Sequence, residues 1–417
     1  MKMNYVLLLL FLTTFSKAQE VRILTLEECQ KAAIEQYPST KKKELISKSL
    51  EYSISNISKG YLPQLSGVNQ LSWQSDVTKF PVSIPGVDMP EISQTQYKAY
   101  TDVNQLIFDG GVIKNRKKTE QAINKIDLQS VEVELYAVKD RVNNLYFGIL
   151  LLDEQAAQNE LLKTDIKIGL KTVEAQIING TAFRSSAEIL KAELLKAELQ
   201  AIEIKNSKIA FVQMLSLFTG FEINEKSIFE KPVPTSTVAT INRPELQLFD
   251  YKNQKLDADK KLISIRDTPK ISLFAQSGMS NPGLNMFEEG VQSYFIGGIR
   301  LNWSMSFTKK KEKAILDIKK EMNNADRETF LFNTNQQLKQ QNAEISKLQE
   351  FIDTDAKIIM LRSSIKKASL AQLENGVIDS NDYLQEVNEE NKAMQNKKAH
   401  EIELLMALYK EKTITGN

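Results

Sequence analysis

Apolar residues recur with helical spacing along two very long stretches of the chain. In residues 112–178, the spacing between successive apolar positions alternates between four and three. These positions are Val131, Leu135, Val138, Val142, Leu145, Ile149 and Leu152. Such a heptad seam predicts a helix that packs along a partner helix at a shallow angle. Neither this stretch nor residues 309–374 contains proline. At 1.5 Å per residue each helix would be about 100 Å long, which is too long for a compact globular domain.

Four shorter segments alternate between apolar and polar residues, which predicts strands at about 64–74, 97–107, 270–278 and 294–304. The alternation is clearest in the last segment. One face there carries Phe295, Gly297, Ile299, Leu301 and Trp303. About ten residues is the length that a tilted transmembrane strand needs, and Trp73 and Trp303 would suit an aromatic girdle at the membrane surface. The strands of a half-buried soluble sheet would show the same alternation.

The chain repeats one order of elements, which is a helix, two strands, a very long helix, an Asn-Gly turn and a returning helix. The landmarks of the first half are Pro63, Phe108 and Asn179-Gly180, and those of the second are Pro269, Phe307 and Asn375-Gly376. Their offsets are 206, 199 and 196 residues. The sequence therefore predicts two repeats at 19–220 and 242–417, joined by a linker at 221–241.

Each repeat is predicted to contain a hairpin tip, at about 179–185 and 375–381. Asn and Gly both tolerate positive φ, so Asn179-Gly180 and Asn375-Gly376 are turn dipeptides. We expect Ser185 to cap the first returning helix, and Ser380 or Asn381 to cap the second. Leu195, Leu199 and Ile202 continue an apolar seam on the first returning helix, whereas the second returning helix is much more polar.

Residues 1–18 are predicted to be a removable export signal. Lys2 precedes an eleven-residue apolar core at 5–15, and Ser16-Lys17-Ala18 supplies small residues for cleavage. An uncleaved anchor is the alternative, although the core is shorter than the 20 or so residues that a spanning helix needs. Without Lys2 and Lys17 the chain is almost neutral, so no nucleic-acid partner is expected. Cys29 is the only cysteine, which excludes an internal disulfide and any CxxC site.

After the signal, no apolar run approaches 18 residues, so a membrane-inserted form would require a closed β-barrel. Four strands cannot close such a barrel, because single-chain barrels begin at eight strands. Subunits would therefore share one barrel. Two chains would supply eight strands and three chains would supply twelve.

Four segments follow one another in a distinctive order, which is Leu24–Cys29 with Tyr37-Pro38, Tyr61–Pro63, Gln105–Gly111 and Asn375–Leu384. In this order they resemble the TolC family of outer-membrane efflux proteins. The resemblance covers essentially the whole mature chain. It implies a homotrimer in the outer membrane, with a twelve-stranded barrel in lipid and a twelve-helix tube that projects into the periplasm. It also implies docking to a periplasmic adaptor and an inner-membrane pump, in an efflux or type I secretion system.

The resemblance also implies roles for particular residues. Asp382, with Asp379 nearby, matches a position that lines the periplasmic entrance, and three copies around an axis would concentrate negative charge there. The alternative is that Asp382 or Asp379 only caps a helix. The two Asn-Gly tips would contact the adaptor, and Gly110-Gly111 would form a flexible joint between strand and helix. The second joint, at Phe307–Lys310, lacks a glycine pair.

The two tips also differ in spacing. Glu188 follows Gly180 by eight residues, whereas Asp382 follows Gly376 by six, which predicts tips of different shape.

No enzymatic chemistry is predicted. The single histidine, His400, lies in the polar last helix and is expected to face solvent. A metal site rich in histidine is impossible, and the sequence contains neither a P-loop nor a GxGxxG motif, so no cofactor is expected. The other interpretation is a structural periplasmic coiled coil, or an adaptor-like protein without a channel. The two strand pairs flanked by aromatic residues favour the channel.

Overall fold

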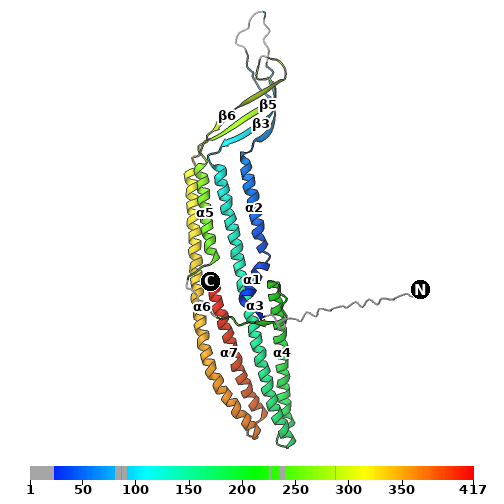
Figure 1. Cartoon of the computed structure of the whole chain (residues 1–417). Coiled ribbons are helices and arrows are strands. Elements are labelled where there is room, and N and C mark those ends of the chain that lie inside the picture. Colours follow the sequence, from blue (N-terminus) through cyan, green and yellow to red (C-terminus); the bar gives the residue numbers. More distant parts are fainter. Residues whose placement is uncertain (1–22, 80–85, 87–91, 225–226, 234–239, 287) are drawn as a thin grey trace, which may run out of the picture. The chain divides into compact units, whose positions relative to one another are not determined.

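The computed structural model describes residues 23–417 apart from 80–85, 87–91, 225–226, 234–239 and 287. The predicted export signal at 1–18 lies outside the described residues. The helices are α1 (Leu26–Gln36), α2 (Thr40–Ser58), the short 3₁₀ helix η1 (Lys59–Tyr61), α3 (Val112–Ile178), α4 (Arg184–Thr219), α5 (Pro244–Ile265), α6 (Lys309–Glu374) and α7 (Ser380–Thr415). The strands are β1 (Ile23–Leu24), β2 (Gln64–Trp73), β3 (Thr95–Phe108), β4 (Ile228–Phe229), β5 (Lys270–Asn281) and β6 (Gln292–Asn302). Figure 1 labels most of these elements.

The predicted fold class, mainly α-helical with a small β part and very long helices, is confirmed. α3 contains 67 residues and α6 contains 66, while α4 and α7 contain 36 each. The order of a helix, two strands, a long helix and a returning helix occurs twice along the chain. This recurrence agrees with the predicted repeats, which remain a prediction.

The chain forms two compact units. Unit 1 comprises Met1–Tyr37, Ala137–Ala239 and Leu338–Ile414, and unit 2 comprises Pro38–Tyr136, Thr240–Gln337 and Thr415–Asn417. Each unit takes segments from both halves of the sequence, since α3 and α6 each contribute one part to each unit. The units therefore do not coincide with the two predicted repeats.

The main core of unit 1 surrounds Tyr146 on α3. β1 pairs in parallel with β4, and the side chains of Leu24 and Phe229 from these strands pack into this core. Residues of α1, α3, α4 and α7 complete it. Tyr146 is fully buried, and its hydroxyl lies 2.7 Å from the carbonyl oxygens of both Leu24 and Glu230. One side chain therefore ties the start of the described chain to the segment that follows α4.

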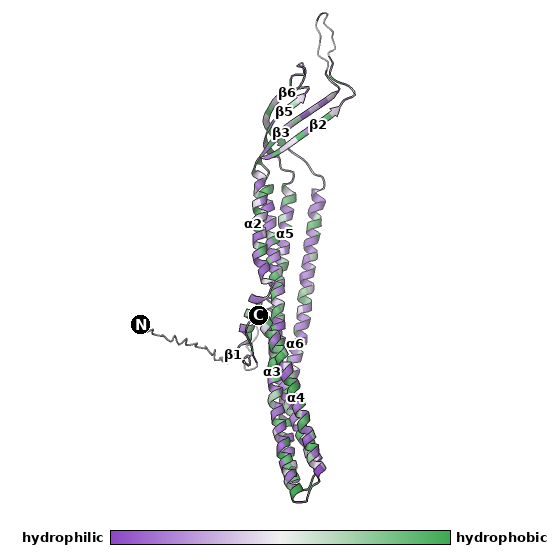
Figure 2. Ribbon diagram, turned by 90° about the vertical axis from the view of Figure 1, so that its right-hand side faces the viewer, coloured by the Kyte–Doolittle hydropathy of each residue, from purple (hydrophilic) through white to green (hydrophobic). Residues whose placement is uncertain are grey.

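The heptad seam predicted on α3 is confirmed, because Val131, Val138, Val142 and Ile149 are all buried. The seam predicted on α4 behaves differently. Leu195, Leu199 and Ile202 are 58–68% exposed, so the described part of their own chain leaves most of their surface uncovered. Figure 2 shows hydrophobic and hydrophilic residues mixed along the long helices, as expected for helices with narrow apolar seams.

Unit 2 contains a four-stranded antiparallel sheet of order β2-β3-β5-β6, together with α2, α5 and parts of α3 and α6. Polar contacts hold the helices together. The Asn124 amide on α3 donates to Ile46 O on α2 at 3.1 Å, and the Asn323 amide on α6 donates to Phe249 O on α5 at 2.9 Å. The helices therefore pack beside one another below a sheet that no helix covers.

None of the helices in the described part of the chain combines the length and the apolar character needed to cross a membrane.

The Tyr146 hydroxyl generates a test of this packing. Replacing Tyr146 with Phe removes the hydroxyl that these two carbonyl oxygens share, although the Leu24 carbonyl oxygen still accepts from the Glu230 N–H at 3.0 Å. We expect each chain to lose about 1–2 kcal/mol of stability. Thermal unfolding in detergent, followed by circular dichroism, measures the change. Tyr52→Phe is the matched control, since Tyr52 is exposed on α2. An equal response from both variants would contradict the role assigned to Tyr146.

Candidate functional site

The register of the four-stranded sheet separates its residues into two unlike faces. Leu71 pairs with Tyr97, Val103 with Ala275, and Leu273 with Ile299, so these side chains point to the same side. The remaining members of this face are Leu65, Gly67, Asn69, Trp73, Thr95, Ala99, Thr101, Gln105, Ile271, Ser277, Met279, Asn281, Ser293, Phe295, Gly297 and Leu301. Its large apolar side chains are strongly exposed in β2 and β6; Leu71, for example, is 77% exposed. The predicted alternation in 294–304 is confirmed.

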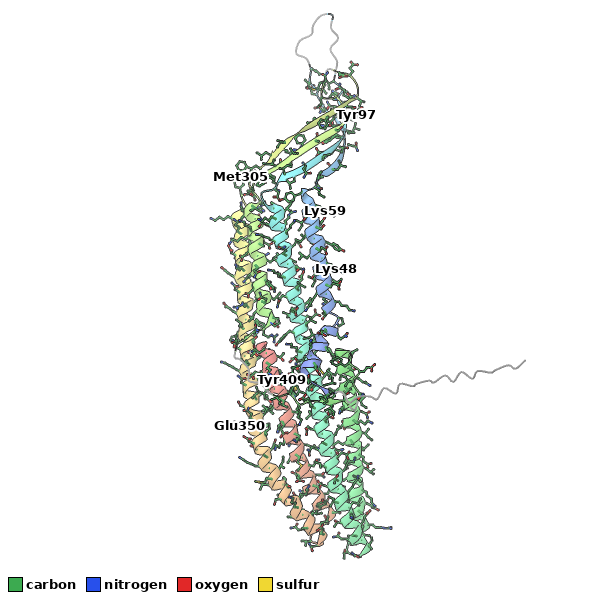
Figure 3. The ribbon with its side chains drawn as sticks, in the orientation of Figure 1. Lys48, Lys59, Tyr97, Met305, Glu350 and Tyr409 are labelled. Carbon is green, nitrogen blue, oxygen red and sulfur yellow. The ribbon has the colours of Figure 1, made fainter. Side chains whose placement is uncertain are left out.

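Aromatic residues mark the end of this sheet that lies near the helices of unit 2. Met305 and Lys59 lie at this end, whereas Tyr97 lies at the opposite end (Figure 3). Trp303 and Phe307 follow β6 at the helix end, and both are exposed. The Trp303 Nε1–H donates to Asp267 O at 3.0 Å, which fixes the indole ring. Trp73, which pairs with Thr95, ends β2 on the same face as Leu71 but at the opposite end of the sheet, near Tyr97.

The opposite face of the sheet is mostly polar. Lys98, Asp102, Lys270 and Arg300 are its charged residues within the strands, and serine, glutamine and asparagine supply most of the remainder. The Gln276 amide donates to the Asp102 carboxylate at 2.7 Å. Arg300 stacks over the ring of Phe274, with 4.5 Å between the guanidinium carbon and the ring centroid. The sheet is thus amphipathic, with one apolar and one polar face.

Gly110 and Gly111 join β3 to α3 with φ values of +68° and +86°, which residues with a side chain rarely adopt. A Cβ at Gly110 would also be only 2.5 Å from the side chain of Thr268. Asp109 caps the helix, because its carboxylate accepts from the N–H of Gly111 at 2.7 Å and from that of Ile113. The joint is therefore tightly packed and hydrogen-bonded.

The second joint uses an arginine instead of a glycine pair. The Arg266 guanidinium donates to Glu312 at 2.8 Å and to Ser306 Oγ at 2.7 Å. Hydrogen bonds from Arg266 and Thr308 lower the pKa of Glu312. A carboxyl group whose pKa is lowered by folding stabilises the folded state at pH values above its unfolded-state pKa. This stabilisation is lost as the pH falls through its folded-state pKa. This joint should therefore weaken only in acid.

The two hairpin tips have the same backbone structure. Gly180 and Gly376 adopt φ of +71° and +68°, and α4 and α7 each begin four residues later. At the first tip the Thr181 N–H donates to Gln176 O at 2.9 Å, and at the second the Val377 N–H donates to Gln372 O at 2.9 Å. This is a Schellman motif in both cases. The expectation of differently shaped tips, drawn from the spacing of Glu188 and Asp382, is wrong for the turns themselves.

The predicted helix caps also need correction. α4 begins at Arg184, and Phe183 takes the N-cap position without a side-chain hydrogen bond, so Ser185 lies inside the helix. The second helix is capped by Asp379, whose carboxylate accepts from the N–H of Asn381 at 2.8 Å and from that of Asp382 at 3.0 Å. Neither Ser380 nor Asn381 is the cap, because the helix starts one or two residues earlier than expected.

A hydrophobic cluster behind the tips draws on α3, α4, α6 and α7, all within unit 1. Tyr383 of α7 is its largest buried member, and its hydroxyl donates to Asp165 O on α3 at 3.2 Å. A Cβ at Gly169 would overlap the Tyr383 ring, so glycine at this position allows the ring to reach α3. Burial raises the pKa of Tyr383, which keeps its hydroxyl protonated.

An ionic cluster next to Tyr383 links three helices. Lys366 of α6 contacts Asp165 of α3 at 2.9 Å and also the Glu390 carboxylate of α7, whose side chain is 3% exposed. Arg362, one turn before Lys366, reaches Glu386 at 3.2 Å and Glu389 at 3.0 Å. Burial opposes the charge on Lys366, but the hydrogen bonds to Glu390 and Asp165 outweigh it and raise its pKa. We call Lys366, Asp165 and Glu390 the three-helix ion cluster.

Sequence reasoning missed the three-helix ion cluster. Its members are up to 225 positions apart in sequence, from Asp165 to Glu390, and each taken alone resembles a surface charge. The only available signal was the polar character of the last helix. Asp382, by contrast, lies on the exposed side of α7 in its first turn, where its carboxylate makes neither a hydrogen bond nor an ion pair with the described residues.

His400 is not solvent-facing as predicted. Its Nδ1 lies 2.6 Å from the Asp355 carboxylate on α6, and its ring lies 5.1 Å from that of Phe351. The expectation is wrong because a polar helix can face a neighbouring polar helix as well as water. Among the described residues, no group of three His, Cys, Asp or Glu side chains could hold a metal ion.

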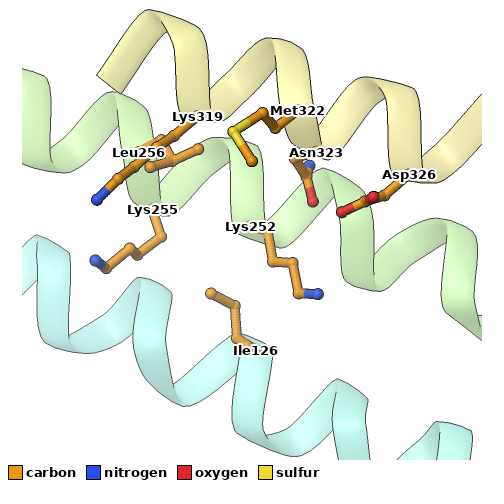
Figure 4. A pocket seen from close by; sticks show the side chains of 8 residues that line it. All are labelled: Ile126, Lys252, Lys255, Leu256, Lys319, Met322, Asn323 and Asp326. Atoms are coloured by element: carbon orange, nitrogen blue, oxygen red, sulfur yellow. The ribbon is translucent and has the colours of Figure 1, made fainter. Parts of the chain in front are cut away.

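Unit 2 also contains a cavity of about 310 Å³ between α3, α5 and α6 (Figure 4). Its apolar wall consists of Ile126, Leu256 and Met322. The lysines on its rim are Lys252, Lys255 and Lys319. Lys255 forms an ion pair with Asp259 at 2.6 Å, and the Lys252 ammonium lies 5.5 Å from the centroid of the Phe249 ring. Met322 is largely exposed, so the cavity opens beside an uncovered part of α6.

The three-helix ion cluster generates a quantitative prediction. Lys366→Met leaves the buried Glu390 carboxylate without its cation, which should cost about 3 kcal/mol per chain. The double variant Lys366→Met with Glu390→Leu should recover most of this loss. Lys196→Met is the control, because Lys196 is exposed and pairs only with Glu193 of its own helix. Thermal unfolding measures all three. A loss in Lys366→Met no larger than in Lys196→Met would contradict the structural role of the cluster.

No protein-family model matches the sequence, and no curated protein matches it. Solved structures do match. The outer membrane protein VceC from Vibrio cholerae is 11% identical, with a TM-score of 0.66 over 93% of this chain and 95% of that one. The CmeC outer membrane channel of Campylobacter jejuni is 13% identical, with a TM-score of 0.63 over 94% and 86%.

The MtrE outer membrane channel of Neisseria gonorrhoeae, solved in its open state, is 14% identical, with a TM-score of 0.64 over 94% of this chain and 89% of that one. Such low identities show the fold, and they show it over nearly the full length of each chain. The resemblance to the TolC family drawn from the sequence is thus confirmed at the level of the fold, and the chain has the fold of the TolC-like outer membrane channels.

Proposed function

We propose that this chain is the subunit of a homotrimeric outer-membrane duct, which conducts solutes passively across the outer membrane and the periplasm. The duct would serve a tripartite efflux system or a type I secretion system, in which an inner-membrane pump supplies the energy and a periplasmic adaptor joins the two. One observation carries the proposal: the sheet exposes an apolar face and two unpaired edges that its own chain cannot satisfy.

The apolar face of the sheet would be more stable in a nonpolar environment than in water. Leu65 and Leu71 of β2, Leu273 and Met279 of β5, and Phe295, Ile299 and Leu301 of β6 are all exposed on it, and a soluble monomer would rarely expose so many apolar side chains on one face. Strands of 10–14 residues have the length needed to cross a tilted barrel wall. Lipid on this face, and water against the polar face, would satisfy both sides.

The two edges of the sheet call for further strands. β2 and β6 each pair on one side only, and an unpaired edge in lipid leaves backbone groups without hydrogen-bond partners. The four strands alternate in direction, so β6 of one copy is antiparallel to β2 of the next. Copies can therefore add in a ring. Three copies would give twelve strands, the number that the sequence resemblance implies.

Uncovered helix seams support the same ring in each unit. In unit 1, α4 exposes Leu195 and Leu199, while α6 exposes Leu361 and Ile365, at similar distances in sequence from their own tips. In unit 2, Ile315, Ile318 and Met322 form an exposed seam on α6, and Leu45 and Tyr52 are exposed one heptad apart on α2. When two different surfaces of neighbouring copies meet head to tail, the copies form a closed ring if the rotation from each copy to the next divides a full turn evenly. The cavity beside Met322 would then lie at a junction between copies.

The hairpin tips are the proposed contact with the adaptor. The dipeptides Asn179-Gly180 and Asn375-Gly376 form the turns, and Ile178, Phe183 and Val377 around them are 71–84% exposed. Exposed apolar side chains on a rigid turn suit a protein partner. Phe183 occupies the place that Asp379 takes in the second tip, so the two tips would offer the adaptor one apolar and one acidic surface.

The gate would lie just behind these tips. Asp382 has no partner among the described residues and lies on the exposed side of α7, so three copies around an axis could approach one another. Two unit charges 4 Å apart repel by about 1 kcal/mol in water and by about 4 kcal/mol at an effective dielectric constant of 20. The three-helix ion cluster would hold α7 against α3 and α6 when the duct is shut, and would have to rearrange for α7 to move.

A structural periplasmic coiled coil is the alternative function. It accounts for the long helices and for the tips. It gives no reason for a sheet with an exposed apolar face, or for tryptophans at its margin.

The location and the assembly can be tested together. The mature protein should fractionate with outer-membrane porins, and mass measurement in detergent should give three chains. A soluble periplasmic form as the main species would support the coiled-coil alternative. A dimer would mean an eight-stranded barrel, and a stable monomer with intact secondary structure would exclude a shared barrel.

The gate is tested by Asp382→Asn. This change removes the charge and leaves the Asp379 cap in place, so the variant should fold and assemble normally. Because three negative charges are lost at the entrance, single-channel recordings should show a reduced preference for cations. Asp353→Asn is the control, since it removes an exposed charge from α6 away from the tips. If the Asp382→Asn variant has the same ion selectivity as the unaltered protein, the role proposed for Asp382 in the gate is contradicted.

A further inference from the structure

A small cavity lies on the polar face of the sheet, at the end marked by Tyr97 and away from the helices of unit 2 (Figure 3). Its volume is about 220 Å³. β2, β3 and β5 contribute to its walls, as do the turn after β5 and Tyr294 of β6. The side chains that matter for its chemistry are Gln70, Ser72, Gln96, Lys98, Ser280 and Tyr294.

Lys98 is the only charged residue among the twelve that line this cavity. Its ammonium lies 4.9 Å from the ring centroid of Tyr100 and 5.4 Å from that of Tyr294. None of the described residues forms an ion pair with it. Asp102, the acidic residue on the same face of β3, already accepts a hydrogen bond from Gln276. Two aromatic rings thus hold a positive charge that remains open to an anion.

Tyr294 supplies an independent observation. Its side chain is 93% buried, since the residue is only 7% exposed, and its hydroxyl has no hydrogen-bond partner. Buried polar groups without a partner are rare, because each one loses its hydration without compensation. Gly278 pairs with both Tyr100 and Tyr294, and a Cβ there would overlap the Ala99 carbonyl oxygen and the Cα and Cβ of Tyr100, so glycine lets β3 and β5 approach closely between the two tyrosines.

The walls of the cavity are held in place by hydrogen bonds. The side-chain amides of Gln74 and Gln96 lie within 3.3 Å of each other across β2 and β3. On the other side, the Gln292 amide donates to Asn285 O at 3.0 Å and to Glu288 O at 2.8 Å, which fixes the turn after β5. A ligand would therefore find its hydrogen-bonding groups already in position, and binding would require little ordering of side chains.

From these contacts we infer that the cavity is a binding subsite for a small hydroxylated organic anion of the sugar-acid type. The Lys98 ammonium would hold the carboxylate, and the Tyr294 hydroxyl would donate its free hydrogen to the solute. The amides of Gln70 and Gln96 and the hydroxyls of Ser72 and Ser280 can donate and accept, as neighbouring hydroxyl groups require. The cavity has the volume of about seven waters at ~30 Å³ each, which is smaller than a drug-sized pocket. The subsite needs only the folded sheet, so it does not depend on conduction.

Calorimetric titration of the purified full-length protein in detergent tests the subsite. Glucuronate is the probe, glucose tests the need for the charge, and acetate tests the need for the hydroxyl groups. Glucuronate should bind saturably and more tightly than either comparator. Lys98→Met should weaken its binding by about tenfold or more, and Tyr294→Phe by about fivefold. Arg300→Met is the matched control, because Arg300 lies on the same face outside the cavity and stacks on Phe274. It should bind glucuronate as the unaltered protein does.

Several outcomes would overturn the inference. Absence of saturable glucuronate binding to the unaltered protein would do so directly. Equal weakening in Lys98→Met and Arg300→Met would mean a diffuse positive field instead of a site. Acetate binding as tight as that of glucuronate would remove the role of the hydroxyl groups. If Lys98→Met fails to fold, Tyr294→Phe decides the matter, and unchanged glucuronate binding in that variant would contradict the subsite. A failure to conduct ions, in contrast, would bear on the proposed duct and leave this result untouched.

Discussion

The structure depends on one constraint, which is set by the four-stranded sheet. A single chain leaves the backbone groups at the edges of this sheet without hydrogen-bond partners and leaves its apolar face without a nonpolar environment. Among the described residues, no helix of unit 2 covers the face that carries Leu71 and Ile299, and no strand pairs with the outer edges of β2 and β6. Backbone groups at these edges need partners, and the apolar face needs a solvent other than water. Association of several chains around a shared polar interior, with lipid outside, meets both needs at once.

The helices also divide into those whose apolar seams are buried within the chain and those whose seams remain exposed. α3 buries most of its seam within its own chain, whereas α4 and α6 carry seams that remain exposed. Side chains that pair inside the chain are concentrated where helices must hold a defined arrangement. Around Tyr383, an aromatic ring, a glycine and three ionic groups fix α7 against α3 and α6. Breaking such a buried ionic contact is costly, so these contacts oppose separation of α7 from α3 and α6.

Sequence periodicity predicted the fold well, because the fold is built from long elements with simple repeats. The strands, the long helices and the Asn-Gly turns all lie close to their predicted positions, and the exposed face of β6 was read correctly residue by residue. Contacts between distant segments could not be predicted in this way. Lys366 and Glu390 each resemble a surface charge in sequence, and only the packing of three helices brings them together. The caps were misplaced for a related reason, since Ser380 and Asp379 are equally good caps by residue type and only the backbone decides between them.

The central claim, that the apolar face of the sheet contacts lipid, can be tested with the two native tryptophans. Trp73 and Trp303 are the only tryptophans in the chain, and both lie exposed at this face or at its margin. The purified protein would be reconstituted into bilayers of ordinary lipid and of lipid with brominated acyl chains, which quench indole fluorescence on contact. We predict strong quenching by the brominated lipid, and its loss when both tryptophans are shielded in a non-brominated detergent. Fluorescence that is equal in the two bilayers would mean that the face does not contact lipid, and would contradict the shared membrane barrel.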